Sequence, residues 1–262
     1  MQITKKKGRD ITLLLGWTVL VTTLSLLFHP QEPYITTFLY FVVPTVYLFL
    51  KYKPYAPTIL AGTFLIGVLV SLPLDFLLNL NESWFVPYEK LLFPFKLFGF
   101  YPIEELIWFI LLALYTLVFY EVFVDGGRRI QISKNFKSAV YIWTLTNVIV
   151  LFSAVVIREY LLVPLSYLFI AGIAVLPPII YVLYKKQSLI KKLLLPTAFF
   201  FFVALNFEFV ALTFGHWGFA DDYVGWISVF GQYFPFEEFF YWILLYPAAC
   251  ISYYELLVDN GE

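Results

Sequence analysis

Paired glutamates open two long apolar runs of this chain. Residues 102–105 and 235–238 both read Pro-x-Glu-Glu, and the two copies lie 133 positions apart. Carboxylates at the mouth of a membrane-spanning helix are expensive to bury, so they are functional candidates by default. Acid–base chemistry uses such groups as proton donors and acceptors. The predicted catalytic residues are therefore Glu104, Glu105, Glu237 and Glu238.

Each glutamate pair also has a plain structural explanation. Pro102 and Pro235 suit the start of a helix, because the first helical turn does not use the N–H that proline lacks. Carboxylates in that first turn interact favourably with the helix dipole, by about 0.3–1 kcal/mol each. Repetition of the pair, with aromatic neighbours both times, favours a functional role over capping alone.

Aromatic side chains follow the glutamates at helical spacing. Residues four positions apart share one face of a helix. An apolar pocket favours the protonated form of a carboxyl, and aromatic faces stabilise cations. The predicted pocket and cation-stabilising residues are Trp108, Phe109, Tyr241 and Trp242, with Trp84 and Trp217 from two outer loops. The alternative for the two loop tryptophans is a place in the aromatic belt of the membrane interface.

Two further acids lie one apolar run earlier than the glutamate pairs. They are Asp75 and Glu208, again 133 positions apart. We expect each to share one proton with a glutamate of the following run, as interacting carboxyls do. The alternative is that each simply faces water at the membrane interface.

The composition predicts an all-α integral membrane protein. The chain is 61% hydrophobic and only 13% charged, whereas a soluble domain is about half apolar and about a quarter charged. The single cysteine, Cys250, excludes a disulfide within the chain. Neither a glycine-rich nucleotide motif nor a His/Cys cluster is present, and Asp221-Asp222 lacks the spaced aspartates that hold a diphosphate. We therefore expect no cofactor, no metal and no nucleic-acid partner.

Eight membrane spans are predicted, each near the 20 or so residues that cross a bilayer as a helix. They cover residues 11–28, 34–50, 58–80, 101–124, 138–157, 162–184, 193–214 and 234–258. With a cytoplasmic N-terminus, only Lys90, Lys96 and Arg158 of the 17 Lys and Arg residues lie outside. This excess of positive charge inside predicts that both termini are cytoplasmic.

The two halves of the chain match each other. We predict a first repeat over residues 1–127, a linker over 128–137 and a second repeat over 138–262, with four spans in each repeat. An even number of spans gives both repeats the same orientation, so they form a parallel repeat about an axis along the membrane normal. One residue of shift then aligns Tyr120-Glu121 with Tyr254-Glu255, and Val124-Asp125 with Val258-Asp259.

Tandem Pro-x-Glu-Glu helices followed by aromatic residues, without a nucleotide motif, resemble the lycopene cyclase domain family. The similarity is to the fused, flavin-independent membrane form, in which both half-domains lie in one polypeptide. It covers most of the chain but depends on Pro102, Glu104, Glu105, Trp108, Pro235, Glu237, Glu238 and Trp242. Tyr241 stands where the first half has Trp108, which leaves open whether the two sites are equivalent.

The resemblance implies a redox-neutral isomerase that converts lycopene to β-carotene through γ-carotene. An acid protonates C2 of an acyclic end, the C5=C6 double bond attacks the cation at C1, and loss of a proton from C6 leaves a β-ring. Glu104 or Glu237 is the expected acid, and Glu105, Glu238, Asp75 or Glu208 the expected base or proton-sharing partner. The implied location is the cytoplasmic membrane, and the implied partners are a carotenoid, the bilayer and other enzymes of carotenoid synthesis.

Other readings of the same residues remain open. The cation chemistry also suits a cyclase of longer C50 carotenoids, or a hydratase in which water captures the cation. A carotenoid-binding membrane protein without catalysis would use the acids as caps and hydrogen-bond anchors. A transporter would have parallel repeats and acids, but near the middle of the membrane rather than near one face.

Overall fold

A computed structural model describes residues 4–30, 32–93, 95–126 and 132–258 of the chain. Helices dominate it, as the composition predicted. Eight helical stretches in the described residues are long and apolar enough to cross a membrane. They run over Lys5–Phe28, Pro33–Tyr52, Ala56–Leu80, Ile103–Asp125, Lys134–Val156, Ser166–Lys185, Gln187–Thr213 and Glu238–Val258. Each corresponds to one predicted span, with ends that differ by a few residues.

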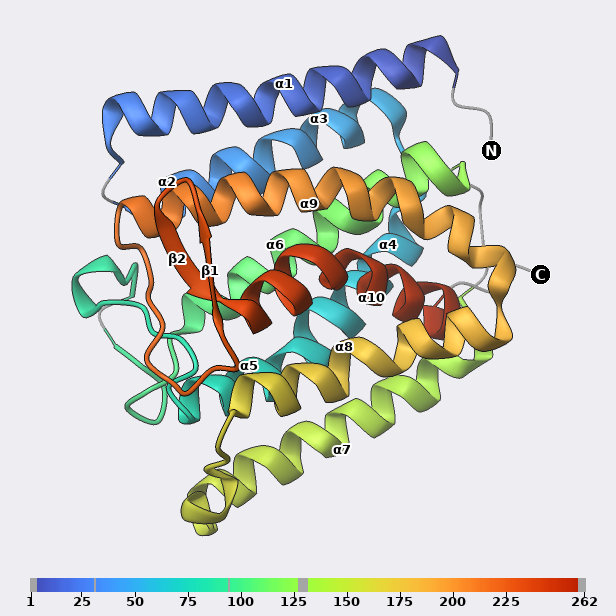
Figure 1. The fold of residues 1–262 in the computed structure, drawn as a ribbon. Helices are drawn as coiled ribbons and strands as arrows, with labels where there is room; N and C mark the ends of the chain where they lie inside the picture. The colour runs from blue at the N-terminus through green and yellow to red at the C-terminus, as the bar shows by residue number, and fades with distance from the viewer. Residues whose placement is uncertain (1–3, 31, 94, 127–131, 259–262) are drawn as a thin grey trace.

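The α-helices and strands are labelled in Figure 1. The α-helices are α1 (Lys5–Phe28), α2 (Pro33–Thr37), α3 (Val43–Tyr52), α4 (Ala56–Thr63), α5 (Ser71–Leu80), α6 (Ile103–Tyr120), α7 (Lys134–Val156), α8 (Ser166–Lys185), α9 (Ile190–Thr213) and α10 (Tyr246–Tyr253). The strands are β1 (Trp226–Val229) and β2 (Gln232–Pro235). Short 3-10 turns lie at η3 (Tyr88–Lys90), η5 (Arg158–Leu161) and η6 (Gln187–Leu189). Helix α7 begins inside the predicted linker 128–137, and residues 127–131 and Asp259 lie outside the described part of the chain.

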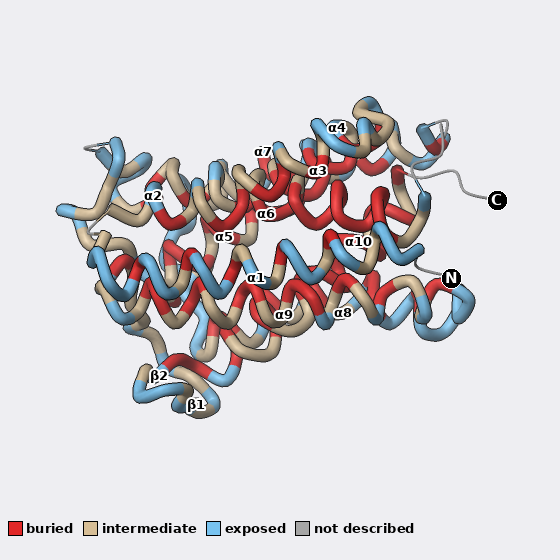
Figure 2. Tube along the Cα trace, turned by 90° about the horizontal axis from the view of Figure 1, so that it is seen from above, coloured by how far each residue is buried: buried red, intermediate tan, exposed pale blue. Residues whose placement is uncertain are grey.

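Helices α6 and α10 form the centre of the bundle, and α1 and α7 lie at opposite outer edges (Figure 1). Buried residues follow the central helices, whereas exposed ones follow the outer helices (Figure 2). The outward side chains are themselves apolar: Phe28, Phe152 and Ile173 are 77%, 67% and 75% exposed. An apolar exterior and long helical segments are compatible with an integral membrane protein, because a helix satisfies its own backbone hydrogen bonds where no water is present.

Several spans change from α-helical to π-helical winding along their length. The π segments among the described residues are η1 (Phe38–Val42), η2 (Phe64–Val70), η4 (Glu121–Asp125), η7 (Glu238–Leu245) and η8 (Tyr254–Val258). Such segments are rare and are often found at functional sites. The longest, η7, begins at Glu238, directly at the second glutamate pair.

A two-stranded hairpin, which the sequence analysis did not predict, precedes the last span. Strands β1 and β2 pair antiparallel, with Trp226 opposite Pro235 and Val229 opposite Gln232. The two turn residues, Phe230 and Gly231, have φ of 51° and 84°, the backbone that a two-residue hairpin loop of type I′ requires. Pro235 therefore ends a strand, one residue before the helix, instead of lying in the first helical turn. Pro102 likewise directly precedes α6 as its N-cap residue.

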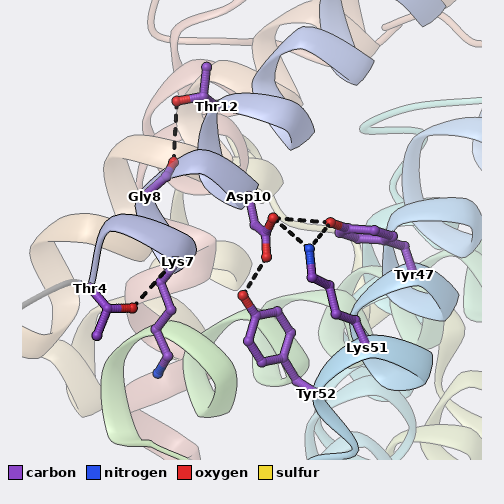
Figure 3. Close-up of polar contacts among 8 residues, drawn as sticks. All are labelled: Thr4, Lys7, Gly8, Asp10, Thr12, Tyr47, Lys51 and Tyr52. Carbon is purple, nitrogen blue, oxygen red and sulfur yellow. Dashed lines mark hydrogen bonds and ion pairs between the residues drawn. The ribbon is translucent and has the colours of Figure 1, made fainter.

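A buried ionic cluster attaches α1 to α3 (Figure 3). The carboxylate of Asp10 accepts hydrogen bonds from Lys51 Nζ at 2.7 Å, from the Tyr47 hydroxyl at 3.2 Å and from the Tyr52 hydroxyl. Asp10 is buried, and a buried carboxylate is tolerated only when it is paired in this way. The cluster gives a structural role to Lys51, which the sequence analysis counted only among the positive charges that predict membrane orientation.

Reciprocal tyrosine–glutamate contacts join the ends of the fourth and eighth spans. The Tyr254 hydroxyl donates to Glu121 Oε1 at 2.5 Å, and the Tyr120 hydroxyl donates to Glu255 Oε1. Lys192 adds ion pairs, at 2.7 Å to Asp125 and at 3.2 Å to Glu255. These acids, whose role the sequence left undecided, hold the two central helices together at the end where α1 begins and η8 ends.

Small residues let the helices approach closely, as is common in membrane bundles. A Cβ atom on Gly67 would lie 2.9 Å from the Ile110 Cα atom of α6. That contact is with backbone, so it is relieved only by moving one helix away from the other. Gly16 in α1 is different, because a Cβ atom there has no other atom within 4 Å.

We predict that Gly67→Ala destabilises the bundle by about 1–3 kcal/mol, the usual effect of overpacking a tight contact. The measurement is the midpoint of thermal unfolding in detergent. Gly16→Ala is the matched control and is expected to leave the midpoint unchanged or slightly higher. Equal midpoints for both variants would contradict the close approach of η2 and α6.

Candidate functional site

The first glutamate of each pair holds an outer loop. Glu104 Oε1 accepts a hydrogen bond from the Phe93 amide at 2.5 Å, and Glu237 Oε1 accepts one from the Val224 amide at 2.7 Å. Both loops lie at the end of the bundle away from the chain termini. The first glutamates of the two pairs therefore make matching contacts. Each binds a loop amide that lies earlier in the chain, by eleven residues for Glu104 and by thirteen for Glu237.

The second glutamate of the first pair lies in a polar cluster of its own. Glu105 Oε2 accepts from the Trp84 indole at 2.8 Å and from Asn79 Nδ2 at 2.5 Å. The same amide nitrogen lies 3.1 Å from Asp75 Oδ1. Asn79 thus bridges Asp75 and Glu105, and the two carboxyl groups lie close enough to interact electrostatically.

The expectation that this carboxyl pair shares one proton concerns its two remaining oxygens. Asp75 Oδ2 and Glu105 Oε1 are both buried and have no hydrogen-bond donor among the described residues. Two buried carboxylate oxygens in contact repel each other unless a proton lies between them. Beside the pair lies the buried hydroxyl of Tyr101, whose pKa is raised because burial disfavours the phenolate and because Asp75 and Glu105 lie close to it. Tyr101 is thus a neutral neighbour of the pair and not a second acid.

The second half of the chain arranges its acids differently. Glu238 Oε2 accepts a hydrogen bond from the Tyr167 hydroxyl. The Trp217 indole donates at 2.9 Å to Glu208 Oε1, whereas its counterpart Trp84 donates to Glu105. Glu208 and Glu238 lie close enough to interact electrostatically, but no hydrogen bond joins them. The two acid clusters therefore have similar residues but different hydrogen-bond partners.

A single cavity brings the second glutamates of both pairs together. Measured out to its mouth, it has about 920 Å³ of space that no protein atom fills. Eight of the predicted site residues line it: Trp84, Glu104, Glu105, Trp108, Phe109, Trp217, Glu238 and Trp242. Asp75 and Glu208, the neighbours of Glu105 and Glu238, do not line the cavity. Two further predicted site residues that do not line it are Glu237 and Tyr241. The arrangement is a mostly apolar chamber with a carboxyl group from each half of the chain in its wall.

Stacked aromatic rings form one wall of this cavity. Trp108 stacks on Trp242, with ring centroids 4.3 Å apart and planes 30° apart, and also lies parallel to Phe207 at 5.8 Å. The indole nitrogen of Trp108 is buried and has no acceptor among the described residues. Aromatic faces of this kind stabilise a positive charge held near them, most strongly where water is excluded. The wall thus suits a reaction in which a cation forms next to a carboxyl group.

His216 also lines the cavity. The sequence analysis considered histidine only as a metal ligand and found no His/Cys cluster. The Nε2 atom of His216 lies 3.1 Å from the Pro30 carbonyl oxygen, which can only accept, so Nε2 carries the proton. Burial lowers the pKa of His216 because an imidazolium ion is poorly solvated there. Asn79, Tyr167 and Phe207 were also missed, since nothing in their local sequence distinguishes them from ordinary residues of an apolar helix. No group of three His, Cys, Asp or Glu side chains in the described part of the chain is placed to hold a metal ion.

We predict that Asp75 and Glu105 hold one proton between them. Asp75→Asn replaces the shared proton with an amide donor, so the fold is kept and one protonated carboxyl is lost. The measurement is the infrared C=O absorption of protonated carboxyl groups in membranes that contain the protein. Glu237→Gln is the control and should leave this band unchanged. A band of equal size in Asp75→Asn and in the unmodified protein would show that the proton lies elsewhere.

We also predict a pH dependence of stability that comes from His216. The unfolded chain protonates this residue near its ordinary pKa of 6.5, while the folded chain resists protonation. Unfolding is therefore favoured as the pH falls below about 6.5, by up to about 1.4 kcal/mol for each pH unit until the lowered pKa is reached. The measurement is the thermal midpoint from pH 8 down to pH 5, for the unmodified protein and for His216→Gln. The difference in thermal midpoint between the two proteins should change only in the acidic half of this range. A difference that is independent of pH would contradict the prediction.

Comparison of the chain with protein-family models, with curated proteins and with solved structures finds no match. The similarity to lycopene cyclase domains thus depends on the two Pro-x-Glu-Glu segments and their aromatic neighbours alone.

Proposed function

We propose that this protein is a membrane carotenoid cyclase that converts the acyclic ends of lycopene into β-rings. The observation that carries the proposal is the mostly apolar cavity that has Glu105 and Glu238 in its wall together with the stacked pair Trp108 and Trp242. Ring closure needs a proton donor, a proton acceptor and walls that tolerate a cation while excluding water. The donor, the acceptor and the cation-tolerant wall each have candidate groups in this one chamber, and most of its lining is apolar.

The chain consists, in this proposal, of two parallel repeats that build one joint site. Support comes from the reciprocal contacts of Tyr120 with Glu255 and of Tyr254 with Glu121, which relate matching residues of the two halves. Support also comes from the first glutamates, each of which holds an outer loop of its own half. Two copies of one module that meet face to face would bring their acids together at their common interface.

Glu105, with its partner Asp75, is the proposed proton donor. A pair that shares one proton can release it to C2 of the terminal double bond and keep a single negative charge over both groups. The tertiary cation at C1 then forms beside the stacked faces of Trp108 and Trp242. Attack by the C5=C6 double bond makes the C1–C6 bond and moves the positive charge to C5.

Glu238 is the proposed proton acceptor. Its hydrogen bond from the Tyr167 hydroxyl supports the ionised form, which is the form that a base requires. Transfer of the C6 proton to Glu238 leaves a C5=C6 double bond in the ring and consumes no oxidant or reductant. The sequence-based hypothesis named Glu104 or Glu237 as the acid. The geometry favours the second glutamates instead, because the first ones bind backbone amides of the outer loops.

The substrate would reach the cavity from the lipid. Tyr34 of α2 and Ile107 of α6 line the cavity and are also 44% and 40% exposed on the outer surface of the bundle. A carotenoid dissolves in the bilayer, so an opening between membrane-spanning helices spares it any passage through water. The proposed location is the cytoplasmic membrane with both termini in the cytoplasm. The distribution of Lys and Arg supports this orientation, as does the position of the beginning of α1 and the end of η8 at one end of the bundle (Figure 1).

Four single variants test the proposed roles in cells that accumulate lycopene. We predict that Glu105→Gln and Glu238→Gln each reduce ring formation by about 10²–10⁴-fold, the usual contribution of a general acid or base. Glu237→Gln is the matched control, because an amide oxygen can still accept from the Val224 amide and the side chain does not line the cavity. Glu104→Gln tests the first glutamate that does line it, and an effect below about tenfold is expected.

Chromatography of the extracted carotenoids gives the result. β-Carotene or γ-carotene from the unmodified protein supports the cyclase, and hydroxylated lycopene would point to a hydratase with the same cation. Unchanged lycopene with well-inserted protein would contradict both. Loss of ring formation in Glu237→Gln with full activity in Glu238→Gln would reverse the assignment of the two glutamates.

A further inference from the structure

A second cavity lies deeper in the bundle, directly behind the aromatic wall of the first. It has about 550 Å³ of unfilled space and is bordered by residues of η2, α5, α8, η7 and α10. Trp84, Phe109, Tyr167 and Trp242 line both cavities. The two chambers are therefore neighbours that share an aromatic partition, and not separate hollows of the bundle.

The lining of the second cavity differs from that of the first in charge. No Asp, Glu, Lys, Arg or His among the described residues borders it, whereas Glu104, Glu105, Glu238, Lys90 and His216 border the first. Its walls are aliphatic and aromatic side chains, with a few hydroxyl groups such as that of Tyr253, which donates to the Ala174 carbonyl oxygen at 3.0 Å. A chamber of this chemistry can bind an apolar chain, but it offers no group for proton transfer.

We propose that the second cavity holds the polyene chain of the substrate while its acyclic end lies among the carboxyl groups of the first cavity. The inference depends on the proposed function for the identity of the ligand. The aromatic partition fits this use, since flat rings pack well against a conjugated chain that passes between them. A long, stiff ligand held at both places would be fixed along its axis, and the terminal double bond would be presented to Glu105.

Three alanines line the second cavity, Ala171 and Ala174 of α8 and Ala249 of α10. Ala174 of α8 and Ala249 of α10 both line it, on helices that pack against each other. A larger side chain at either position is expected to take up part of the cavity that the alanine now borders. Ala174 and Ala249 are therefore the residues expected to set how much of a polyene the protein can accept.

The test measures binding separately from ring formation. Purified protein in detergent is titrated with lycopene, and with a polyene of half the length that carries the same acyclic end. Quenching of tryptophan fluorescence reports both, because Trp84 and Trp242 line the partition. The variants are Ala174→Leu and Ala249→Leu, and the control is Ala198→Leu, the same substitution at an exposed position of α9.

We expect Ala174→Leu and Ala249→Leu to weaken lycopene binding by about tenfold or more, which equals about 1.4 kcal/mol. Binding of the half-length polyene should change by less than about twofold, which also shows that the variants are folded, and the control should match the unmodified protein. Equal loss for both ligands, or loss for neither, would overturn the inference. If this pattern appears in a protein that forms no rings from lycopene, the second cavity stands as the chain site and the proposed catalysis falls.

Discussion

Burial of carboxyl groups in an apolar bundle is the constraint on which the rest of this structure depends. An ionised carboxylate without partners in a low-dielectric interior is too unstable to persist. Glu105 accordingly has Trp84, Asn79 and Asp75 around it, and Glu238 has the Tyr167 hydroxyl. These partners come from α5, α8 and an outer loop, so satisfying two acids fixes how those elements pack around α6 and η7. The acids thus organise the end of the bundle at which α6 and η7 begin.

The two glutamates of each Pro-x-Glu-Glu segment make different contacts. On consecutive helical residues, side chains point about 100° apart, so one can face a loop while the next faces the bundle interior. Glu104 and Glu237 bind loop amides, whereas Glu105 and Glu238 line the cavity, which Glu104 also borders. The first glutamate of each pair therefore holds a loop rather than capping its own helix, and the second is the one free to face the cavity.

The sequence predicted the helices of the fold better than the contacts between them. Hydropathy located all eight spans, because crossing a bilayer requires a long apolar run whatever the tertiary contacts. The hairpin at residues 226–235 was hidden, since its aromatic residues resemble the start of the next span. The joint cavity and the contact of Trp217 with Glu208 depend on how helices far apart in the chain pack, which local spacing does not encode. One clue was present: matching residues are 133 apart at the glutamate pairs and 134 apart at Tyr120 and Tyr254. A π turn holds one residue more than an α turn, and η7 lies between those two points.

The differences between the halves suit a site that must both give and take a proton. Two identical acid clusters facing one cavity would have equal proton affinities, so neither would act preferentially as donor. Here Asn79 and Asp75 accompany Glu105, whereas position 212, the counterpart of Asn79, is a leucine, and the indole of Trp217 serves Glu208 instead of Glu238. Glu105 thus has an indole and an amide donor and a neighbouring aspartate, whereas Glu238 has one hydroxyl donor and a neighbouring glutamate. Two unlike carboxyl groups in the wall of a single chamber are what the proposed reaction requires, because one must give a proton and the other must take one.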